Sequence, residues 1–344
     1  MKIITSTLVA LFLCAAVNYG QETLPVKTTG YGQINVPGKQ FLYVLESRGP
    51  GFFRIDITDG TVTRVGECGG MTFDWDSKGN LYTVAGPVTK ISPDGKRTPF
   101  IKGFGMCIGI AIDSHDNLYT SEYNKHDRTF KIPLSKITDD MLPITVTHPK
   151  DASGKENLEV DADIKPEGAK EAMIILQRNV PDSYSFWCDA WDNCYFTQNG
   201  PQIIWKYSPE GKVSRFGYGA YWARAGCPDA NGEFYHLGGD IVKVATNGLR
   251  IGMFAPSADL NHPCSIDLDA QGNLYQGQPC HVMFDQKNPP KRDATGTPLD
   301  INQRGIIYKY TPDGRRSVLA YCGTNPFGIR MFPKNKFPTV KPAE

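Results

Sequence analysis

The chain repeats one short phrase six times, and this repetition constrains its fold more than any other feature. Each copy leads from an aspartate through small or polar residues and Asn or Gly to an apolar residue and an aromatic. The copies are Asp76-Ser-Lys-Gly-Asn-Leu-Tyr82, Asp113-Ser-His-Asp-Asn-Leu-Tyr119, Asp189-Ala-Trp-Asp-Asn-Cys-Tyr195, Pro228-Asp-Ala-Asn-Gly-Glu-Phe-Tyr235, Asp269-Ala-Gln-Gly-Asn-Leu-Tyr275 and the truncated Gln40-Phe-Leu-Tyr43. Repeats of about 40 residues that each hold a set of short strands are typical of a β-propeller. We therefore expect an all-β fold.

The residues around each phrase predict a blade of four antiparallel strands. An apolar stretch precedes the phrase, as in Gly109-Ile-Ala-Ile-Asp113, and a further strand follows it, as in Ile204-Trp-Lys-Tyr207. A turn such as Pro209-Glu-Gly211 then leads into the last strand. Proline presets φ at the first position of such a turn and glycine takes the positive φ, so these residues indicate hairpins. Each repeat is therefore expected to be a meander that forms one blade.

The two ends of the chain are expected to complete one blade together. The first copy of the phrase has no apolar strand before it, whereas the C-terminal Asn325-Pro-Phe-Gly-Ile-Arg-Met331 looks like an innermost strand without the rest of a blade. Pairing the two would leave no open sheet edge. The chain is then a six-bladed β-propeller over residues 40–333, after a lead-in at 21–39 and before a tail at 334–344.

Two segments interrupt the repeat. Tyr119 and Tyr195 are nearly twice as far apart as other neighbouring copies, so residues 135–170 are either an insertion or a degenerate seventh blade. We expect an insertion, because the strand-like motifs inside the segment lie too close together for a pair of strands. Residues 281–304 are rich in Pro, Lys and Asp and are expected to form a loop between the second and third strands of the last blade. Such a loop over the channel mouth would be a lid or a solvated decoration.

The N-terminal segment, residues 1–20, has the composition of a secretory signal. Lys2 precedes an apolar run over residues 8–17, and Ala16 and Gly20 are small residues suited to cleavage. The run is too short for a membrane span, and no other segment of the sequence could cross a membrane. We therefore expect the segment to be removed and the protein to be secreted or periplasmic.

Export favours disulfides over metal ligands for the cysteines. Eight cysteines follow residue 20, and no Cys-x-x-Cys pair occurs. The repeat register predicts three disulfides, which pair Cys188 with Cys194, Cys264 with Cys280, and Cys68 with Cys322. The remaining Cys107 and Cys227 are either a fourth pair or free thiols.

Charge and motifs exclude several classes of function. The formal net charge is +1 with no basic block, which argues against nucleic acid as a partner. The chain contains no Gly-x-Ser-x-Gly elbow, no Walker motif and no dinucleotide-binding loop. Covalent hydrolase and nucleotide-dependent activities are therefore not expected.

Functional residues of a propeller are expected where loops converge on one mouth of the central channel. The repeat register places two carboxylates there, Glu46 and Glu122, each just after the second strand of its blade. Two such carboxylates would suit calcium, which prefers oxygen ligands, or acid–base catalysis. In the alternative interpretation they are solvated rim charges that bond to the backbone or to Arg48.

Two histidines supply candidate metal ligands at the same mouth. His262 and His236 come from adjacent blades and, with Glu122, could hold zinc or copper around an open position. In the alternative interpretation, His262 caps its own loop and His236 is a half-buried strand residue.

Arginine and aromatic side chains near the mouth would suit a carboxylated or sugar-like ligand. Arg48 and Arg224 could grip a carboxylate with two parallel hydrogen bonds, and Trp187 could stack on a sugar. In the alternative interpretation the aromatics pack between blades.

The Asn/Gly-Leu-Tyr phrases, the Gly109-Ile-Ala-Ile-Asp113 stretch and the Pro-Asp-Gly turns resemble those of NHL-repeat propellers and of the related senescence-marker protein/gluconolactonase family, over roughly residues 40–333. The resemblance implies one divalent metal, calcium rather than zinc, at the top of the channel. Asn325 in Thr-Asn-Pro-Phe-Gly looks like that family's inner-strand asparagine ligand, whereas the family's Glu and Asp ligands have no clear counterpart. Virginiamycin-lyase-like propellers, another relative, use a His and a Glu around a metal, and this similarity assigns those parts to His262 and Glu122.

Together these features predict an exported propeller that binds, hydrolyses or eliminates a small polar ligand, such as a lactone or a sugar acid, at the top of its channel. As an enzyme it would use the metal to polarise a carbonyl, while a carboxylate or histidine moves protons. The expected catalytic residues are Glu46, Glu122 and His262. The expected metal ligands are Glu46, Glu122, His262 and Asn325. The expected ligand-binding residues are Arg48, Arg224, Trp187 and His236. The alternative is a non-catalytic propeller whose top face binds a protein or a glycan, and nothing in the sequence indicates the oligomeric state.

Overall fold

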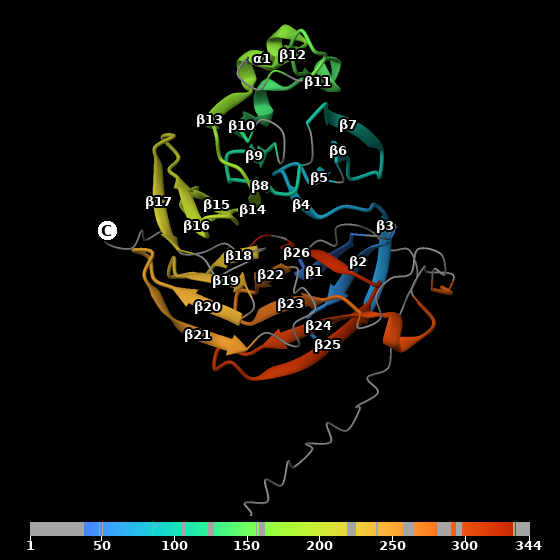
Figure 1. Ribbon diagram of the computed structural model, residues 1–344. Coiled ribbons are helices and arrows are strands. Elements are labelled where there is room, and N and C mark those ends of the chain that lie inside the picture. The colour runs from blue at the N-terminus through green and yellow to red at the C-terminus, as the bar shows by residue number, and fades with distance from the viewer. Residues whose placement is uncertain are drawn as a thin grey trace, which may run out of the picture.

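The expected blades are present as six sheets arranged in a ring around a central channel (Figure 1). The structure is a computed structural model that describes residues 38–334 except 48, 50, 85, 105–106, 123–126, 156, 158–161, 219–224, 239, 257–264, 281–289, 294–297 and 333. Five of the sheets have four strands and one has six. Nearly all of the regular structure is β-strand, so the six-bladed all-β propeller predicted from the repeats is confirmed.

Every blade has its first strand at the channel and its fourth at or near the rim. Blade 1 consists of β26 (Pro326–Phe332), β1 (Phe41–Glu46), β2 (Gly51–Asp56) and β3 (Val62–Glu67). Blade 2 consists of β4 (Thr72–Trp75), β5 (Leu81–Val84), β6 (Val88–Ile91) and β7 (Arg97–Lys102). Blade 3 consists of β8 (Ile110–Ile112), β9 (Asn117–Ser121), β10 (Thr129–Pro133) and β13 (Ile174–Gln177). Blade 4 consists of β14 (Ser183–Cys188), β15 (Cys194–Gln198), β16 (Ile203–Tyr207) and β17 (Val213–Tyr218). Blade 5 consists of β18 (Ala225–Pro228), β19 (Phe234–Gly238), β20 (Asp240–Val244) and β21 (Arg250–Pro256). Blade 6 consists of β22 (Ser265–Leu268), β23 (Leu274–Gln278), β24 (Gly305–Tyr310) and β25 (Arg316–Cys322).

Strand β26 closes the ring from the C-terminal part of the chain, as predicted. It pairs antiparallel with β1, placing Phe332 opposite Phe41 and Arg330 opposite Tyr43. It also lies beside β22 of blade 6 and β4 of blade 2. The innermost strand of blade 1 therefore comes from the far end of the sequence, and it brings Arg330 to the channel.

In its described residues, the segment at 135–170 forms no seventh blade. It begins with 3-10 helices at Leu134–Lys136 and Asp139–Met141 and continues through β11 (Ile144–Thr147), β12 (Asp163–Lys165) and the helix α1 (Glu167–Ala172). Strand β11 pairs in parallel with β7, so β11 and β12 extend the sheet of blade 2 to six strands at the rim (Figure 1). The segment departs from blade 3 and thus fastens it to blade 2. Of the helices in the described residues, none is long and apolar enough to cross a membrane.

The repeated phrase forms a hydrogen-bonded turn between the first and second strands. In blade 4 the Asp189 carboxylate accepts the backbone N–H of Asn193 at 2.9 Å, the side-chain amide of Asn193 at 2.8 Å and the hydroxyl of Tyr195 at 3.0 Å. The same three bonds recur at Asp76, Asp113 and Asp269. Since buried polar groups require partners, the fold itself accounts for the recurrence of Asp, Asn and Tyr.

Aromatic side chains fill the interfaces between neighbouring blades. Tyr43 of blade 1 packs edge-on against Trp75 of blade 2, with 5.0 Å between ring centroids. Trp187 of blade 4 stacks on Phe234 of blade 5 at 4.7 Å. All four side chains are buried, and each stabilises the fold by roughly 2–3 kcal/mol through apolar burial. This packing holds the inner strands in place around the channel.

Candidate functional site in the upper channel

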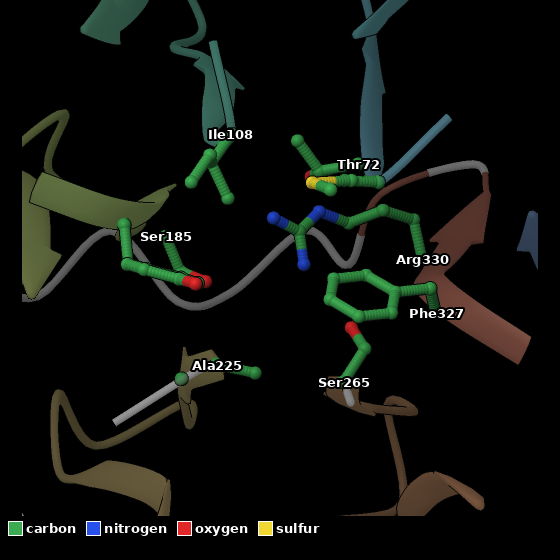
Figure 2. A pocket seen from close by; sticks show the side chains of 10 residues that line it. Thr72, Ile108, Ser185, Ala225, Ser265, Phe327 and Arg330 are labelled. Atoms are coloured by element: carbon green, nitrogen blue, oxygen red, sulfur yellow. The ribbon is translucent and has the colours of Figure 1, made fainter. Parts of the chain in front are cut away.

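The inner strands of all six blades begin around one end of the channel, which we call the upper channel. A small cavity lies there, with room for about one water-sized molecule (Figure 2). Each blade contributes a residue at or near the start of its inner strand, namely Phe327, Thr72, Ile108, Ser185, Ala225 and Ser265. The site therefore combines apolar walls with hydroxyl groups at a point where six chain segments meet.

Arg330 is the one charged side chain among the described residues that line this cavity. Figure 2 shows it extending from β26 into the channel. Its Nη2 donates to the carbonyl of Phe186 in blade 4 at 3.0 Å, and its Nη1 donates to the carbonyl of Ile329 at 3.2 Å. Because blade 4 lies opposite blade 1 in a ring of six, the side chain spans the channel. The sequence analysis did not single out Arg330, and the available signal was a charged residue inside an otherwise apolar inner strand.

Two carboxylates lie further along the inner strands and join neighbouring blades. Asp74 of β4 accepts a backbone N–H from the inner strand of blade 3 at 2.7 Å, and Asp267 of β22 accepts one from β26 at 2.7 Å. The Nζ of Lys334 also donates to Asp74 at 2.9 Å. Burial raises the pKa of Asp267, an effect that the charge of Arg330 partly offsets. Both carboxylates are therefore engaged in closing the ring.

Glu46 is buried at the end of β1, where donors surround its carboxylate. Oε1 accepts the backbone N–H of Thr324 at 2.7 Å and Nη2 of Arg292 at 3.0 Å. Oε2 accepts the backbone N–H of Gly51 at 3.2 Å and Nη1 of Arg292 at 3.3 Å. A cation would compete with these donors for the same lone pairs. This arrangement does not favour the metal and proton-transfer roles predicted for Glu46, which stay predictions.

Glu122 occupies the equivalent position after β9 and is also fully buried. Its Oε2 accepts Nε of Arg128 at 2.9 Å, and its Oε1 lies 3.2 Å from Nε2 of His148, which comes from the 135–170 segment. Both predicted carboxylates are thus paired with arginine inside the protein. Both side chains are buried rather than solvated. Glu46 does accept backbone N–H groups, as the alternative interpretation expected, and Arg48 lies outside the described residues.

One group of side chains in the described residues has the spacing of metal ligands, and it lies at the other end of the blades. Ligand atoms of Asp113, His115 and Asp192 all lie within 4.8 Å of one another. These residues belong to the turns that follow the inner strands of blades 3 and 4. The Asp113 carboxylate is already the acceptor of its own turn.

The position of Asp192 is explained by a clamp between blades. Its carboxylate accepts the backbone N–H and the hydroxyl of Ser114, both at 2.8 Å. Asp116 accepts the same two groups of Ser77 at 2.7 and 2.6 Å, one blade earlier. The hydrogen bonds between Asp116 and Ser77 form without a histidine. The approach of Asp192 to Asp113 and His115 is therefore explained by contacts between blades and needs no bound ion. The described residues therefore do not assemble a metal site in the upper channel.

Three further predicted site residues take part in local bonding or packing. Asn325 donates from Nδ2 to the hydroxyl of Ser47 at 2.6 Å. His236 is buried on β19, and burial lowers the pKa of its imidazole to about 4, helped by the charge of Arg250. Trp187 is buried in the interface between blades 4 and 5. Their metal-binding and ligand-binding roles stay predictions.

The remaining candidate residues are not among those that the structure describes. Arg48, Arg224, His262 and Cys264 lie outside the described residues, as does the signal segment at 1–20. The predicted pairing of Cys264 with Cys280 is therefore not tested.

The other cysteines differ in how the fold places them. Cys188 and Cys194 are direct partners in the register of β14 and β15, as expected from the turn between them. Both are thiols in this structure, and burial raises the pKa of each. Cys68 and Cys322 are buried thiols in separate apolar clusters. All of the predicted disulfides stay predictions.

Comparison with known proteins finds solved structures that share the fold. No protein-family model matches the chain, and no curated protein matches it. A solved structure described as the nidogen/laminin complex is similar over 87% of this chain and 100% of its own, with 11% identity and a TM-score of 0.57. A Bacteroides caccae protein of unknown function is similar over 86% of this chain and 100% of its own, with 10% identity and a TM-score of 0.52.

A streptogramin B lyase is also similar, over 87% of this chain and 84% of its own, at 12% identity and a TM-score of 0.49. At such identities a likeness shows the fold alone. The chain is a β-propeller, and its expected membership in the gluconolactonase-like family stays a prediction.

Proposed function

We propose that this protein binds a small polar ligand, such as a lactone or a sugar acid, in the upper channel. The observation that carries the proposal is the cavity to which all six blades contribute. Ligand sites are typically concave, largely apolar, and equipped with a few polar groups that fix orientation. Here Ile108 and Phe327 supply apolar surface, while Thr72, Ser185 and Ser265 supply hydroxyls. The predicted export belongs to the same proposal.

Hydrolysis or elimination of the bound ligand is a further part of the proposal, and it needs groups beyond those seen in the cavity. The described cavity holds hydroxyls and one guanidinium but no carboxylate or imidazole. His262 would have to supply proton transfer, since Glu46 and Glu122 are engaged in buried ion pairs. No catalytic step is assigned to a metal, because the two described carboxylates predicted as metal ligands, Glu46 and Glu122, are already paired with arginine. Elemental analysis of the purified protein tests the predicted calcium.

A cavity-filling variant tests ligand binding directly. We expect sugar acids or lactones to raise the melting temperature of the wild type and to give saturable heats in calorimetry. Ala225→Leu adds bulk to the cavity wall and should abolish both effects. Ala230→Leu is the matched control, because Ala230 is exposed in the turn at the other end of the same inner strand. Equal binding by the wild type and Ala225→Leu would place the ligand elsewhere.

The alternative predicted from the sequence, a non-catalytic propeller whose top face binds a protein or a glycan, stays a prediction. Two large apolar side chains in the segment 281–304, Leu299 and Ile301, are 58% and 37% exposed. Exposed apolar side chains in a loop favour such a role when they form part of a larger patch. A glycan array probed with the wild type and Ala225→Leu would separate the two functions, since a face-binding protein should tolerate the filled cavity.

A further inference from the structure

We propose that the outer rim of blades 4 and 5 binds an anionic lipid surface. This rim is separate from the upper channel, so its role does not depend on the ligand proposed there. Seven large apolar side chains are exposed in the described residues. Four of them lie on or directly before the outer strands β17 and β21 and are between 56% and 67% exposed, and we call them the rim ridge: Tyr218, Leu249, Ile251 and Met253.

A contact between two glycines brings the outer strands of the two blades together. A Cβ atom added to Gly217 of β17 would lie 2.6 Å from the carbonyl oxygen of Gly248, in the turn before β21. A Cβ atom added to Gly248 would overlap the carbonyl oxygen of Phe216. Only glycine permits so close an approach. Tyr218 and Leu249 directly follow the two glycines, so the two parts of the rim ridge adjoin at one side of the propeller (Figure 1).

The apolar side chains of β21 project from both faces of the strand. Met253 lies opposite Val242 of β20, whereas Gly252 lies opposite the next residue, Lys243, and Ile251 is the extra residue of a β-bulge beside Gly252. Successive residues of β20 face opposite sides of the sheet, so Ile251 and Met253 do as well. Bulges make an edge strand a poor template for a further strand. Side chains that diverge in this way form a projecting ridge, which a fluid bilayer can surround.

The charges beside the rim ridge are positive. Arg215 of β17 and Arg250 of β21 are exposed, and neither strand contains an aspartate or a glutamate. In the described residues neither guanidinium pairs with a carboxylate, and that of Arg215 lies over the ring of Tyr218, 3.8 Å from its centroid. Aromatic and basic side chains beside aliphatic ones suit the headgroup region of an anionic bilayer. Docking of the same ridge on a second copy of this chain would instead bring four arginines together.

Flotation with lipid vesicles tests the proposal. The protein is purified after export, so that the apolar run at 8–17 does not contribute. One set of vesicles is phosphatidylcholine alone, and the other has two parts phosphatidylcholine to one part phosphatidylglycerol, an anionic lipid. We expect the wild type to bind the anionic vesicles about tenfold more tightly than the neutral ones, and to lose this preference as the salt concentration rises.

Two double variants separate the charged from the apolar contribution. Arg215→Gln/Arg250→Gln should weaken binding to anionic vesicles by about 10- to 30-fold, roughly fivefold for each arginine, and leave binding to neutral vesicles unchanged. Ile251→Ser/Met253→Ser should weaken binding to both kinds of vesicle by about tenfold, because less apolar surface enters the bilayer.

The matched controls replace exposed residues on the outer strands of other blades. Ile174→Ser, on β13 of blade 3, and Arg97→Gln, on β7 of blade 2, should bind both kinds of vesicle like the wild type. All the substituted side chains are exposed, so the variants should also melt at the wild-type temperature.

The results distinguish a lipid surface from other partners of the rim. A wild type that does not float with anionic vesicles would overturn the proposal, as would binding that both double variants retain. Dimers in analytical ultracentrifugation that Ile251→Ser/Met253→Ser abolishes would assign the ridge to a second copy of the chain instead. Calorimetric binding of an alternating glutamate–valine peptide, without vesicle binding, would assign it to an acidic segment of another protein. None of these results bears on the ligand of the upper channel.

Discussion

Glu46 of β1 and Arg292 form an ion pair between residues 246 positions apart, with 3.0 Å between Oε1 and Nη2. The carboxylate is fully buried, and the arginine side chain is 21% exposed. The pair connects the first strand of the propeller to the segment at 281–304. It therefore fixes a loop of the last blade to the blade that closes the ring.

Replacing Glu46 by Gln should destabilise the protein by about 2 kcal/mol. The change removes the charge that Arg292 faces and one of the acceptors used by Thr324 and Gly51, and breaking a buried ion pair on one side is costly. Urea unfolding measures the difference. Glu67→Gln is the control, because the Glu67 side chain is 60% exposed and its pair with Arg64 should contribute little.

The same pair of variants tests the calcium role predicted for Glu46. The hydrogen bonds around the carboxylate lead us to expect that added calcium changes the melting temperature of the wild type and of Glu46→Gln by the same amount. A stabilisation by calcium that is present in the wild type and lost in Glu46→Gln would show that Glu46 is a ligand after all.

The sequence predicted the propeller architecture well because the residues of the repeated phrase bond to one another. Asp189, Asn193 and Tyr195 bond to one another within seven residues, so their recurrence reports local structure that needs no knowledge of the rest of the chain. The register also placed Glu46 and Glu122 at equivalent positions correctly. Two of their partners, Arg292 and His148, could not be predicted, because they belong to segments outside the repeat and the spacing of the repeat does not determine the path of those segments.

The repeat pattern could not predict which residues line the channel. Arg330 is the C-terminal strand's contribution to a cavity shared by six blades, and its contact with the Phe186 carbonyl depends on where blades 1 and 4 face each other. For Trp187 the sequence offered two interpretations, a ligand contact and packing between blades. The ring stacks on Phe234 of blade 5, as the second interpretation expected, and the ligand contact stays a prediction.

Oxidation should join Cys188 and Cys194 in a cross-strand disulfide. One position closer to the turn, the N–H of Asp189 donates to the carbonyl of Asn193 at 2.9 Å, so the cysteines occupy a non-hydrogen-bonded pair. Such pairs have Cα atoms about 4.5 Å apart, within the range that a disulfide spans. Protein purified from an oxidising compartment should show a tryptic peptide in which these two residues are linked, with the loss of two hydrogens by mass spectrometry.

The link between Cys188 and Cys194 should stabilise the oxidised protein by about 2 kcal/mol, the value expected for a short closed loop. The Cys188→Ala/Cys194→Ala variant should lose the difference between oxidised and reduced protein in urea unfolding. Cys227→Ala is the control and should keep it, because Cys227 lies buried on β18 in another blade. Free thiols at both positions after purification under oxidising conditions would contradict the prediction.

His236 should make the protein lose stability as the pH falls below neutrality. Burial lowers the pKa of its imidazole from 6.5 to about 4. Between these two pH values the unfolded chain therefore binds a proton at residue 236, whereas the folded protein does not. The stability from this group is complete above pH 6.5 and is lost as the pH falls towards 4, by roughly 3 kcal/mol in all. His236→Phe replaces the imidazole with an apolar ring beside Phe234 and should flatten the stability profile over that interval, as measured by urea unfolding at successive pH values. An unchanged slope in His236→Phe would show that the buried imidazole is not its source.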